Sequence, residues 1–272
     1  MNCIRNTLFI GKVLNYIEQL PSTNSFVLDQ LSKNDAPVEN LSDRTFMGEG
    51  YVAYTFNQTA GRGQYGNRWE SEAGKNIAMS ILLKPRFLEA RQQFHLNKAI
   101  SLAVHDVFSV YNDGTSRNYR EGGVSVKWAN DIFIGDKKIC GILIQNNLLG
   151  SRIEASVVGI GINAHQMNFQ NLPHASSLKL ETGKTFELFD IVEAICQAIE
   201  KRYWQLKSGH FDALGTEYLS KLYRFGQDAI YQYPEGAYFQ GKIVDISETG
   251  KLCLETKLGL ENFDIKEIKF VL

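Results

Sequence analysis

The chain has 272 residues, of which 44% are hydrophobic and 22% are charged, and its formal net charge is −1. A chain of this length can bury a substantial core and form one large domain with a smaller one. The balanced charge gives no general attraction to nucleic acid or acidic membranes, and no apolar run reaches the roughly 20 residues of a membrane helix. No signal-peptide pattern opens the sequence, so we expect a cytoplasmic globular protein.

The cysteines and histidines show no metal-binding spacing. The four cysteines are far apart, without a C-x-x-C pair, and the five histidines include no H-E-x-x-H motif. We therefore expect reduced thiols and structural histidines. A metal would have to be bound by oxygen ligands.

Hydrophobic periodicity predicts a mixture of helices and strands up to residue 224. The helices have apolar residues at three- and four-residue steps, and Ser22–Ser25 offer caps for the first one. Predicted helices span Phe26–Lys33, Arg91–Tyr111, Phe186–Leu206 and Phe211–Leu222. Predicted strands span Phe9–Tyr16, Tyr51–Phe56, Ile77–Leu83, Val124–Trp128, Ile132–Ile134, Lys138–Gln145 and Ile153–Ile160. The polar segments Asn34–Gly50 and Asn112–Gly123 are expected to be loops.

The pattern changes near Phe225. Short alternating runs follow, separated by Pro-Glu-Gly, Glu-Thr-Gly and Leu-Gly turns, which is typical of a small closed antiparallel barrel. The runs are Ala229–Tyr233, Tyr238–Asp245, Lys251–Glu255 and Glu261–Phe270. We therefore predict one domain over residues 1–224 and a second over 225–272.

A glycine-rich segment, Asn57–Lys75, lies between two of the predicted strands. Its glycines let the backbone approach a ligand closely, while Arg62 and Arg68 supply fixed positive charge that matches carboxylate or phosphate. The segment therefore predicts an anionic, nucleotide-like ligand.

Two phosphate-binding motifs are matched only in part. Gly61, Gly63 and Gly66 fit G-x-G-x-x-G, but the helix and the downstream acidic residue of a dinucleotide site do not follow. Gly183-Lys184-Thr185 resembles the end of a P-loop, but Leu178 stands where its first glycine belongs. We interpret the second motif as a surface turn.

Three further segments place polar groups at the ends of apolar strands. They are Lys127–Asp131, Lys138–Leu143 and Gly159–Asn163, and the second has a glycine inside a strand, where something must approach closely. Taken singly, each segment is better explained as a strand end, a hairpin lysine or a turn, and Ser22 and Thr23 are better explained by helix capping. Their occurrence together with the glycine-rich segment indicates a ligand site.

Taken together, these segments resemble the ordered motifs of the biotin–protein ligases, or biotin–[acetyl-CoA-carboxylase] ligases. The matching motifs are Gln58–Gly63 with Trp69, Lys127–Asp131, Lys138–Leu143, Gly159–Asn163 and the signature Ser22–Asn24. The resemblance spans essentially the whole chain. It implies an α+β fold with a mixed sheet flanked by helices, related to class II aminoacyl-tRNA synthetases, and a C-terminal SH3-like β-barrel.

The resemblance implies a reaction in two steps. Biotin and ATP form biotinyl-5′-AMP and pyrophosphate, and biotin then passes to one lysine of a biotin carboxyl carrier domain. Because the first step brings two anions together, the site must neutralise charge on both. ATP with Mg²⁺, biotin and the carrier domain are therefore the implied cofactors and partners.

The resemblance also assigns residues to these roles. Arg62, Lys127 and Lys138 are implied to be catalytic. Biotin is implied to contact Ser22, Thr23, Asn24, Gln58, Gly61, Arg62, Lys138, Gly141 and Ile142. ATP or the adenylate is implied to contact Gly63, Gln64, Arg68, Trp69, Lys127, Asn130, Asp131 and Asn163. Asp131 and Asn163 also offer oxygens to Mg²⁺ brought in by ATP, and the glycine-rich segment is expected to become ordered over the adenylate.

The chain departs from the family pattern at three positions. Gln64 and Asn67 stand where many members have arginine, so Arg62 and Arg68 would do more of the charge neutralisation. Ala129 stands where proline is usual, which should relax the strand end.

Other interpretations remain open beside this one. Ser22 leaves no room for a preceding helix-turn-helix module, so we expect a monofunctional ligase that does not bind operator DNA. The alternative functions are a lipoate–protein ligase and a non-catalytic biotin or nucleotide sensor. Exposed sheet edges leave a homodimer open.

Overall fold

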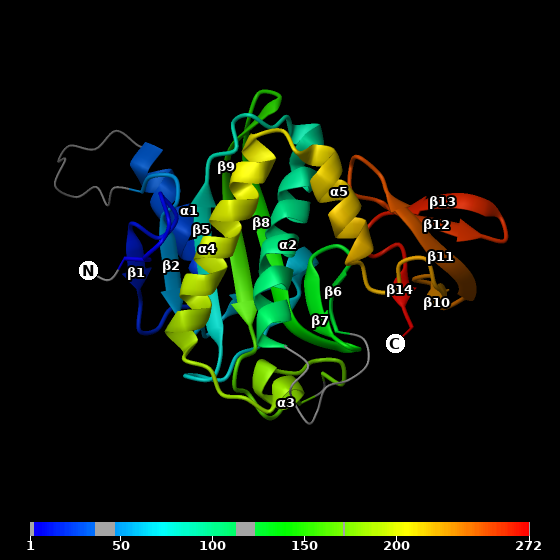
Figure 1. Ribbon diagram of the computed structural model, residues 1–272, viewed down its shortest axis with the longest axis horizontal. Helices are drawn as coiled ribbons and strands as arrows, with labels where there is room; N and C mark the ends of the chain where they lie inside the picture. Colours follow the sequence, from blue (N-terminus) through cyan, green and yellow to red (C-terminus); the bar gives the residue numbers. More distant parts are fainter. Residues whose placement is uncertain (1–2, 36–46, 113–122, 171, 272) are drawn as a thin grey trace.

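The computed structural model describes residues 3–35, 47–112, 123–170 and 172–271. Its centre is a seven-stranded mixed sheet with the order β1-β2-β5-β9-β8-β7-β6 (Figure 1). Strands β1 and β2 are parallel, and the other neighbours are antiparallel. The strands are β1 (Leu14–Tyr16), β2 (Val52–Thr55), β5 (Ile77–Leu83), β6 (Val124–Lys127), β7 (Asp131–Ile134), β8 (Lys137–Leu149) and β9 (Arg152–Ile162).

Helices cover both faces of this sheet. The long helices α2 and α4 lie side by side across one face (Figure 1), and α1 packs on the other face against β5 and β9. The helices are α1 (Thr23–Asp35), α2 (Gln93–Tyr111), α3 (Leu178–Thr182), α4 (Leu188–Lys207) and α5 (Phe211–Ser220). Within the described ranges, every helix is too short or too polar to cross a bilayer.

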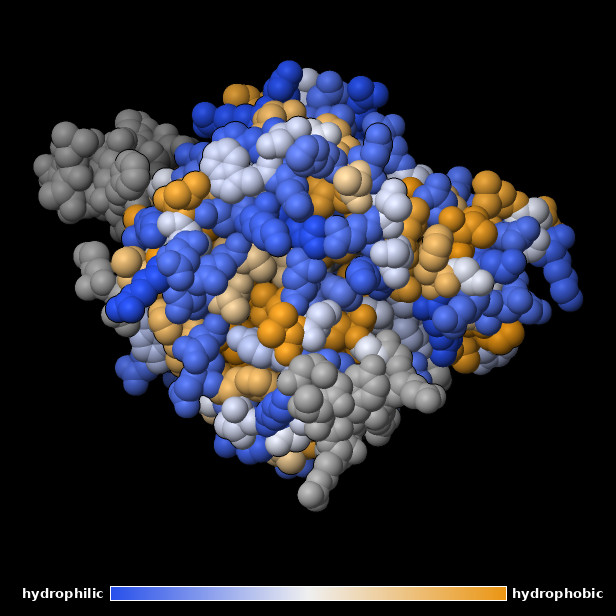
Figure 2. Space-filling model, in the orientation of Figure 1, coloured by the Kyte–Doolittle hydropathy of each residue, from blue (hydrophilic) through white to orange (hydrophobic). Residues whose placement is uncertain are grey.

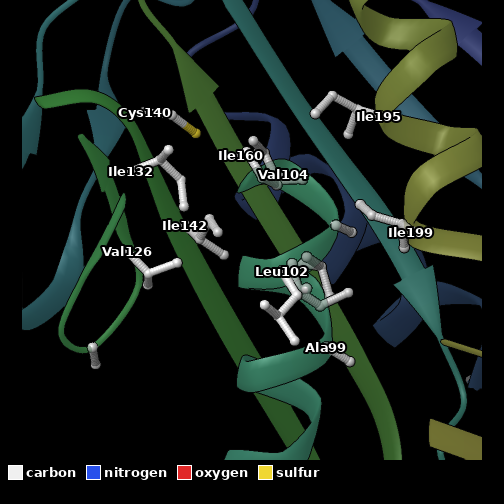
Figure 3. Packing of buried hydrophobic residues seen from close by; sticks show 14 of the residues in the cluster. Ala99, Leu102, Val104, Val126, Ile132, Cys140, Ile142, Ile160, Ile195 and Ile199 are labelled. Carbon is white, nitrogen blue, oxygen red and sulfur yellow. The ribbon is translucent and has the colours of Figure 1, made fainter. Parts of the chain in front are cut away.

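Strand β5 shows how the sheet divides the core. Its seven residues are all buried, and successive side chains point to opposite faces. Ile81 belongs to the large cluster that includes α2 and α4, while Leu82 belongs to a small cluster with Val27 of α1. Figure 3 shows the large cluster, in which Leu102 of α2 packs among aliphatic residues of β8 and β9. A strand buried on both faces reads as a continuous apolar run, which is why it was predictable.

The C-terminal strands form a separate five-stranded antiparallel sheet in the order β13-β12-β11-β10-β14. They are β10 (Asp228–Gln232), β11 (Tyr238–Ile246), β12 (Leu252–Thr256), β13 (Gly259–Phe263) and β14 (Lys269–Phe270). Hydrophobic groups lie at the surface of this region, at the right of the space-filling view (Figure 2). The predicted boundary near Phe225 falls between α5 and β10 and stays a prediction.

The predicted closed barrel is wrong in one respect. Within the described residues, the edge strands β13 and β14 do not pair with each other, so the sheet stays open. The single run predicted over Glu261–Phe270 is divided by a turn in which the Asp264 N–H donates to the Glu267 carboxylate at 2.6 Å and Lys266 has a φ of 76°. This turn leaves β14 only two residues long.

Smaller differences concern loops and short elements. Only the last three residues of the predicted strand Phe9–Tyr16 form β1. Helix α3 was not predicted, and Gly183 ends it with a φ of 69°, which fits a turn rather than a phosphate loop. Most of the two predicted loops, residues 36–46 and 113–122, lies outside the described residues.

Glu200 of α4 fixes the N-terminal segment to the helix layer. Its buried carboxylate accepts hydrogen bonds from three successive backbone N–H groups, those of Leu8, Phe9 and Ile10, at 2.6, 2.8 and 2.9 Å. Charge-assisted bonds of this kind are about twice as strong as neutral ones. They hold Ile10, which is fully buried, in the main core.

Replacing Glu200 by Gln should therefore lower the free energy of unfolding by about 2–3 kcal/mol, because an amide has only one accepting oxygen and no charge. Urea denaturation measures this change. Glu193→Gln is the matched control, because Glu193 accepts a single, exposed bond from the Arg5 N–H, and its cost should stay within about 0.5 kcal/mol. Equal losses in the two variants would contradict this account of the N-terminal segment.

Candidate active site

The predicted site residues surround a single cavity of about 930 Å³. It lies on the α1 side of the central sheet and is bounded by the glycine-rich segment, by β8 and β9, and by part of the C-terminal sheet. Every residue assigned to biotin or ATP by resemblance lines it except Gly61. These lining residues are Ser22, Thr23, Asn24, Gln58, Arg62, Gly63, Gln64, Arg68, Trp69, Lys127, Asn130, Asp131, Lys138, Gly141, Ile142 and Asn163.

The floor of the cavity is the first turn of α1. Ser22 precedes the helix, and its Oγ accepts from the Ser25 N–H at 3.4 Å, which is the capping role foreseen for it. The Thr23 N–H donates to Gln58 Oε1 at 2.9 Å, so the side chain of Gln58 satisfies another free N–H of this turn. Capping and cavity lining are therefore combined in the same residues.

A buried serine that sequence analysis missed lies behind this floor. Ser80, in the middle of β5, has no exposed surface, and its Oγ lies 2.8 Å from Thr23 Oγ1 and 2.6 Å from Asn24 Oδ1. Asn24 Nδ2 in turn donates to the Leu143 carbonyl at 3.2 Å and to Gln145 Oε1 at 3.0 Å. A single polar residue inside an otherwise apolar strand was the available signal.

The glycine-rich segment forms a short hairpin in the structure. β3 (Gly61–Arg62) pairs with β4 (Arg68–Trp69), and the 3₁₀ turn η2 (Gln64–Gly66) joins them. A Cβ at Gly61 would lie 2.5 Å from the Trp69 carbonyl oxygen and 2.6 Å from Gln58 Nε2. Gly61 is therefore explained by close packing inside the hairpin, and its predicted contact with biotin does not follow from its position.

Trp69 packs onto the strands that carry the other glycines. A Cβ at Gly161 would lie 2.5 Å from its indole ring, and a Cβ at Gly141 would lie 3.0 Å from it. The predicted close approach to a strand glycine is thus made by Trp69. Its Nε1 is buried and has no hydrogen-bond partner among the described residues, so it can donate to a ligand.

Lys127 and Lys138 reach the cavity from neighbouring strands and have different partners. Lys138 Nζ pairs with Asp131 Oδ1 at 2.8 Å. Lys127 Nζ instead lies 4.7 Å from the centre of the Phe270 ring and 5.5 Å from that of Phe133, a cation–π arrangement. Burial lowers the pKa of Lys127, although Asp131 opposes this effect. Lys127 is therefore a cation whose charge an incoming anion would stabilise.

Two asparagines complete the polar lining. Asn130 Nδ2 donates to the Ile142 carbonyl. Asn163 Nδ2 donates to the Ser176 carbonyl at 3.0 Å, which leaves its Oδ1 buried without a partner among the described residues. A buried acceptor without a partner indicates a ligand donor, because leaving it unpaired costs about 1–3 kcal/mol.

The C-terminal sheet contributes to this cavity, which sequence analysis did not foresee. Ile265, Ile268, Lys269 and Phe270 line the cavity. The Trp128 Nε1–H donates to the Gly250 carbonyl at 2.9 Å and so joins the Lys127–Asp131 segment to the second sheet. The Trp128–Ala129 peptide bond is cis.

No three His, Cys, Asp or Glu side chains come together in the part of the chain that the structure describes. Asp131 is a carboxylate at the cavity, and its Oδ1 pairs with Lys138. This donor set fits a hard cation held mainly by a bound ligand's phosphates. The arrangement as a whole suits a ligand with one neutral polar end and one anionic end.

Binding of an anion such as ATP in this cavity should weaken as the pH rises, and at a lower pH than an ordinary lysine would cause. Because the folded-state pKa of Lys127 is lowered, its positive charge is lost at a lower pH than usual. Calorimetric titration between about pH 8 and pH 10.5 measures this, since the phosphates of ATP stay ionised there. Lys127→Arg keeps its charge and should move the loss of affinity to higher pH, whereas identical curves would contradict this role for Lys127.

The chain is similar in sequence and in structure to known proteins. The chain is 27% identical over 271 residues to the bifunctional ligase/repressor BirA of Bacillus subtilis, covering 97% of this chain and 75% of that protein. It is 26% identical over 225 residues to the biotin–[acetyl-CoA-carboxylase] ligase of Paracoccus denitrificans, covering 78% and 87%. The Aquifex aeolicus biotin protein ligase in complex with biotin and ATP shares the fold, with a TM-score of 0.71, 23% identity and coverage of 96% and 99%.

The family model of the Biotin/lipoate A/B protein ligase family matches residues 16–163, more than half of the chain. This range contains the floor at Ser22–Asn24, the glycine-rich hairpin and all three polar segments of the cavity. The resemblance drawn from the motifs is confirmed, and the chain belongs to the biotin/lipoate A/B protein ligase family.

Proposed function

We propose that the chain is a biotin–protein ligase, which forms biotinyl-5′-AMP from biotin and ATP and transfers biotin to a lysine of a biotin carboxyl carrier domain. The observation that carries this proposal is the convergence of Arg62, Lys127 and Lys138 on one cavity whose opposite end is a neutral hydrogen-bonding floor. Relatives and structural neighbours named as biotin ligases support it.

In the first step, a carboxylate oxygen of biotin attacks the α-phosphorus of ATP. The new carboxylate–phosphorus bond forms as the bond to the β-phosphate oxygen breaks, and pyrophosphate leaves. Lys138 and Arg62 neutralise the carboxylate and α-phosphate as they meet, and Lys127 stabilises the phosphates. Lys138 must exchange its bond to Asp131 for one to substrate, so Asp131 balances the charge of Lys138 before substrate binds.

The uncharged end of biotin fits the floor. Ser22, Thr23, Asn24 and Gln58 offer donors and acceptors for a ureido ring, while Gly141 leaves room beside it. The side chain of Ile142, which was also expected to form this wall, points to the other face of the sheet and packs in the main core. A dithiolane ring, which has no N–H or C=O group, would leave these buried groups unpaired. This mismatch favours biotin over lipoate.

The nucleotide fits the other end. Gly63, Gln64 and Arg68 of the hairpin border the space for phosphates, and Asn163 Oδ1 can accept a hydrogen bond from an amino group of the base. Trp69 and Asn130 complete this part of the lining. Asp131 is the carboxylate placed to bind Mg²⁺ that enters with ATP.

In the second step, the lysine amine of the carrier domain attacks the acyl carbonyl of the adenylate, an amide bond forms, and AMP leaves. The Gly61–Trp69 hairpin lies over the cavity and would exclude water from the mixed anhydride. Consumption of ATP and the four free cysteines fit a cytoplasmic enzyme. The absence of operator binding, the homodimer and the division into two domains stay predictions.

Biotin-dependent ATP–pyrophosphate exchange tests this proposal against its alternatives. We expect labelled pyrophosphate to enter ATP only when biotin is present, because adenylate formation is reversible. Exchange with lipoate instead of biotin would identify a lipoate–protein ligase. No exchange with either acid, although biotin or ATP binds, would identify a sensor.

Lys138→Ala should separate the two steps. Adenylate formation should slow by about 100-fold or more, because the two anions lose a shared cation, whereas transfer from chemically synthesised biotinyl-5′-AMP to a carrier domain should fall much less. Lys137→Ala is the matched control, because the neighbouring Lys137 donates to the Pro173 carbonyl instead and is absent from the cavity lining. Equal losses in both steps would contradict the proposed role of Lys138.

A further inference from the structure

Ser80 is a buried polar residue that the proposed reaction does not use. It occupies the centre of β5, where all seven residues are buried, and it is absent from the cavity lining. Its hydroxyl nevertheless contacts two residues that do line the cavity, Thr23 at 2.8 Å and Asn24 at 2.6 Å. Ser80 can therefore act on a ligand only through these neighbours.

The hydrogen bonds around Asn24 fix the direction of the Ser80 hydroxyl. Both protons of Asn24 Nδ2 are used by acceptors, the Leu143 carbonyl and Gln145 Oε1. Asn24 Oδ1 can only accept, and Ser80 Oγ is 2.6 Å away. Because a serine has a single hydroxyl proton, that proton is committed to Asn24.

The commitment of this proton determines what Thr23 can do. The Thr23 hydroxyl lies between two partners, Ser80 Oγ at 2.8 Å and Gln58 Oε1 at 3.4 Å. Gln58 Oε1 accepts from the Thr23 N–H and also from the Thr23 hydroxyl, so the hydroxyl proton of Thr23 is used within the floor and not toward the cavity. Thr23 Oγ1 therefore presents only lone pairs to the cavity.

Ser22 has the opposite hydrogen-bonding role and can donate to a ligand. Its Oγ accepts from the Ser25 N–H, and its own hydroxyl proton stays available to donate into the cavity, since Ser22 is part of the lining. The floor thus offers an acceptor and a donor on adjacent residues. This pair is complementary to a cyclic urea, in which an N–H group is bonded directly to a carbonyl carbon.

We propose that Ser80 is a positioning residue that locks the Thr23 hydroxyl as an acceptor and so tunes the floor for a ligand ring carrying N–H next to C=O. The inference rests on the proposed function, because it explains how the biotin ureido group is selected. The ureido group is selected because the Thr23 hydroxyl proton has a fixed direction, and Ser80 itself makes no contact with the ligand.

Ser80→Ala tests this role in the exchange assay. Thr23 loses the contact that fixes its hydroxyl and becomes free to rotate, so we expect the KM for biotin to rise about tenfold, equivalent to roughly 1.4 kcal/mol. The kcat and the KM for ATP should stay within about twofold, because Ser80 does not touch the reacting atoms. Ser80→Cys has nearly the same volume and a weak S–H donor, and it should recover part of the affinity.

Ser156→Ala is the matched control. Ser156 is also fully buried in the central sheet, on β9, and its Oγ donates to the side-chain oxygen of an asparagine, Asn146, at 2.7 Å, away from the cavity. The Ser156→Ala variant should lose about as much stability as Ser80→Ala, which thermal unfolding measures. Its KM for biotin should stay unchanged. A similar rise in KM in both variants would reduce Ser80 to a structural role and overturn the inference.

A double-mutant cycle isolates the path through Thr23. In a Thr23→Val background there is no hydroxyl left to orient, so adding Ser80→Ala should change the KM for biotin by less than about twofold. A full tenfold effect in that background would overturn the inference while leaving the proposed function intact. A wild-type chain without biotin-dependent exchange would instead overturn the proposed function, and this inference with it.

Discussion

The cavity depends on two facing glycines in the central sheet. Gly141 of β8 and Gly161 of β9 lie directly opposite each other in the antiparallel ladder, and neither has a side chain to fill the space above it. The Trp69 indole packs onto these two glycines, while Asn24 packs against Gly159 nearby. Side chains at these positions would occupy the volume that the hairpin and a ligand have to share. The site therefore exists because β8 and β9 carry glycines, without side chains, at these positions.

The positive charges of Lys127 and Lys138 are stabilised in two different ways. Lys138 has a carboxylate partner in Asp131, and removing a cation from water is costly unless it is paired. Lys127 packs against the aromatic faces of Phe133 and Phe270, which compensate less than a paired carboxylate does. An anion that enters thus gains a new partner in Lys127 without displacing one, whereas at Lys138 it must compete. This asymmetry would let phosphates bind before the charge on Lys138 is released.

Sequence patterns predicted much of the fold and the main site residues for identifiable reasons. β5 and α2 are regular and strongly apolar, so their bounds were predicted to within two residues. The short helix α3 and the open edge of the C-terminal sheet depend on local turns and long-range pairing, which periodicity does not encode. Phe270 reaches Lys127 only because a distant strand folds back onto the cavity. Ser80 was visible as a polar residue in an apolar strand, but its meaning depends on which side chains face it.

The hydrogen bond from the Trp128 indole to the Gly250 carbonyl has a thermodynamic consequence. Because it fastens the second sheet to the segment that carries Lys127, the two sheets share one wall, and order in either supports order in the other. A molecule that occupies the cavity should therefore also make the outlying strands harder to melt. By reciprocity, a mutation that destabilises those strands should lower the affinity for that molecule. The last fifth of the chain should thus contribute to the free energy of ligand binding, although all of it lies outside the family match.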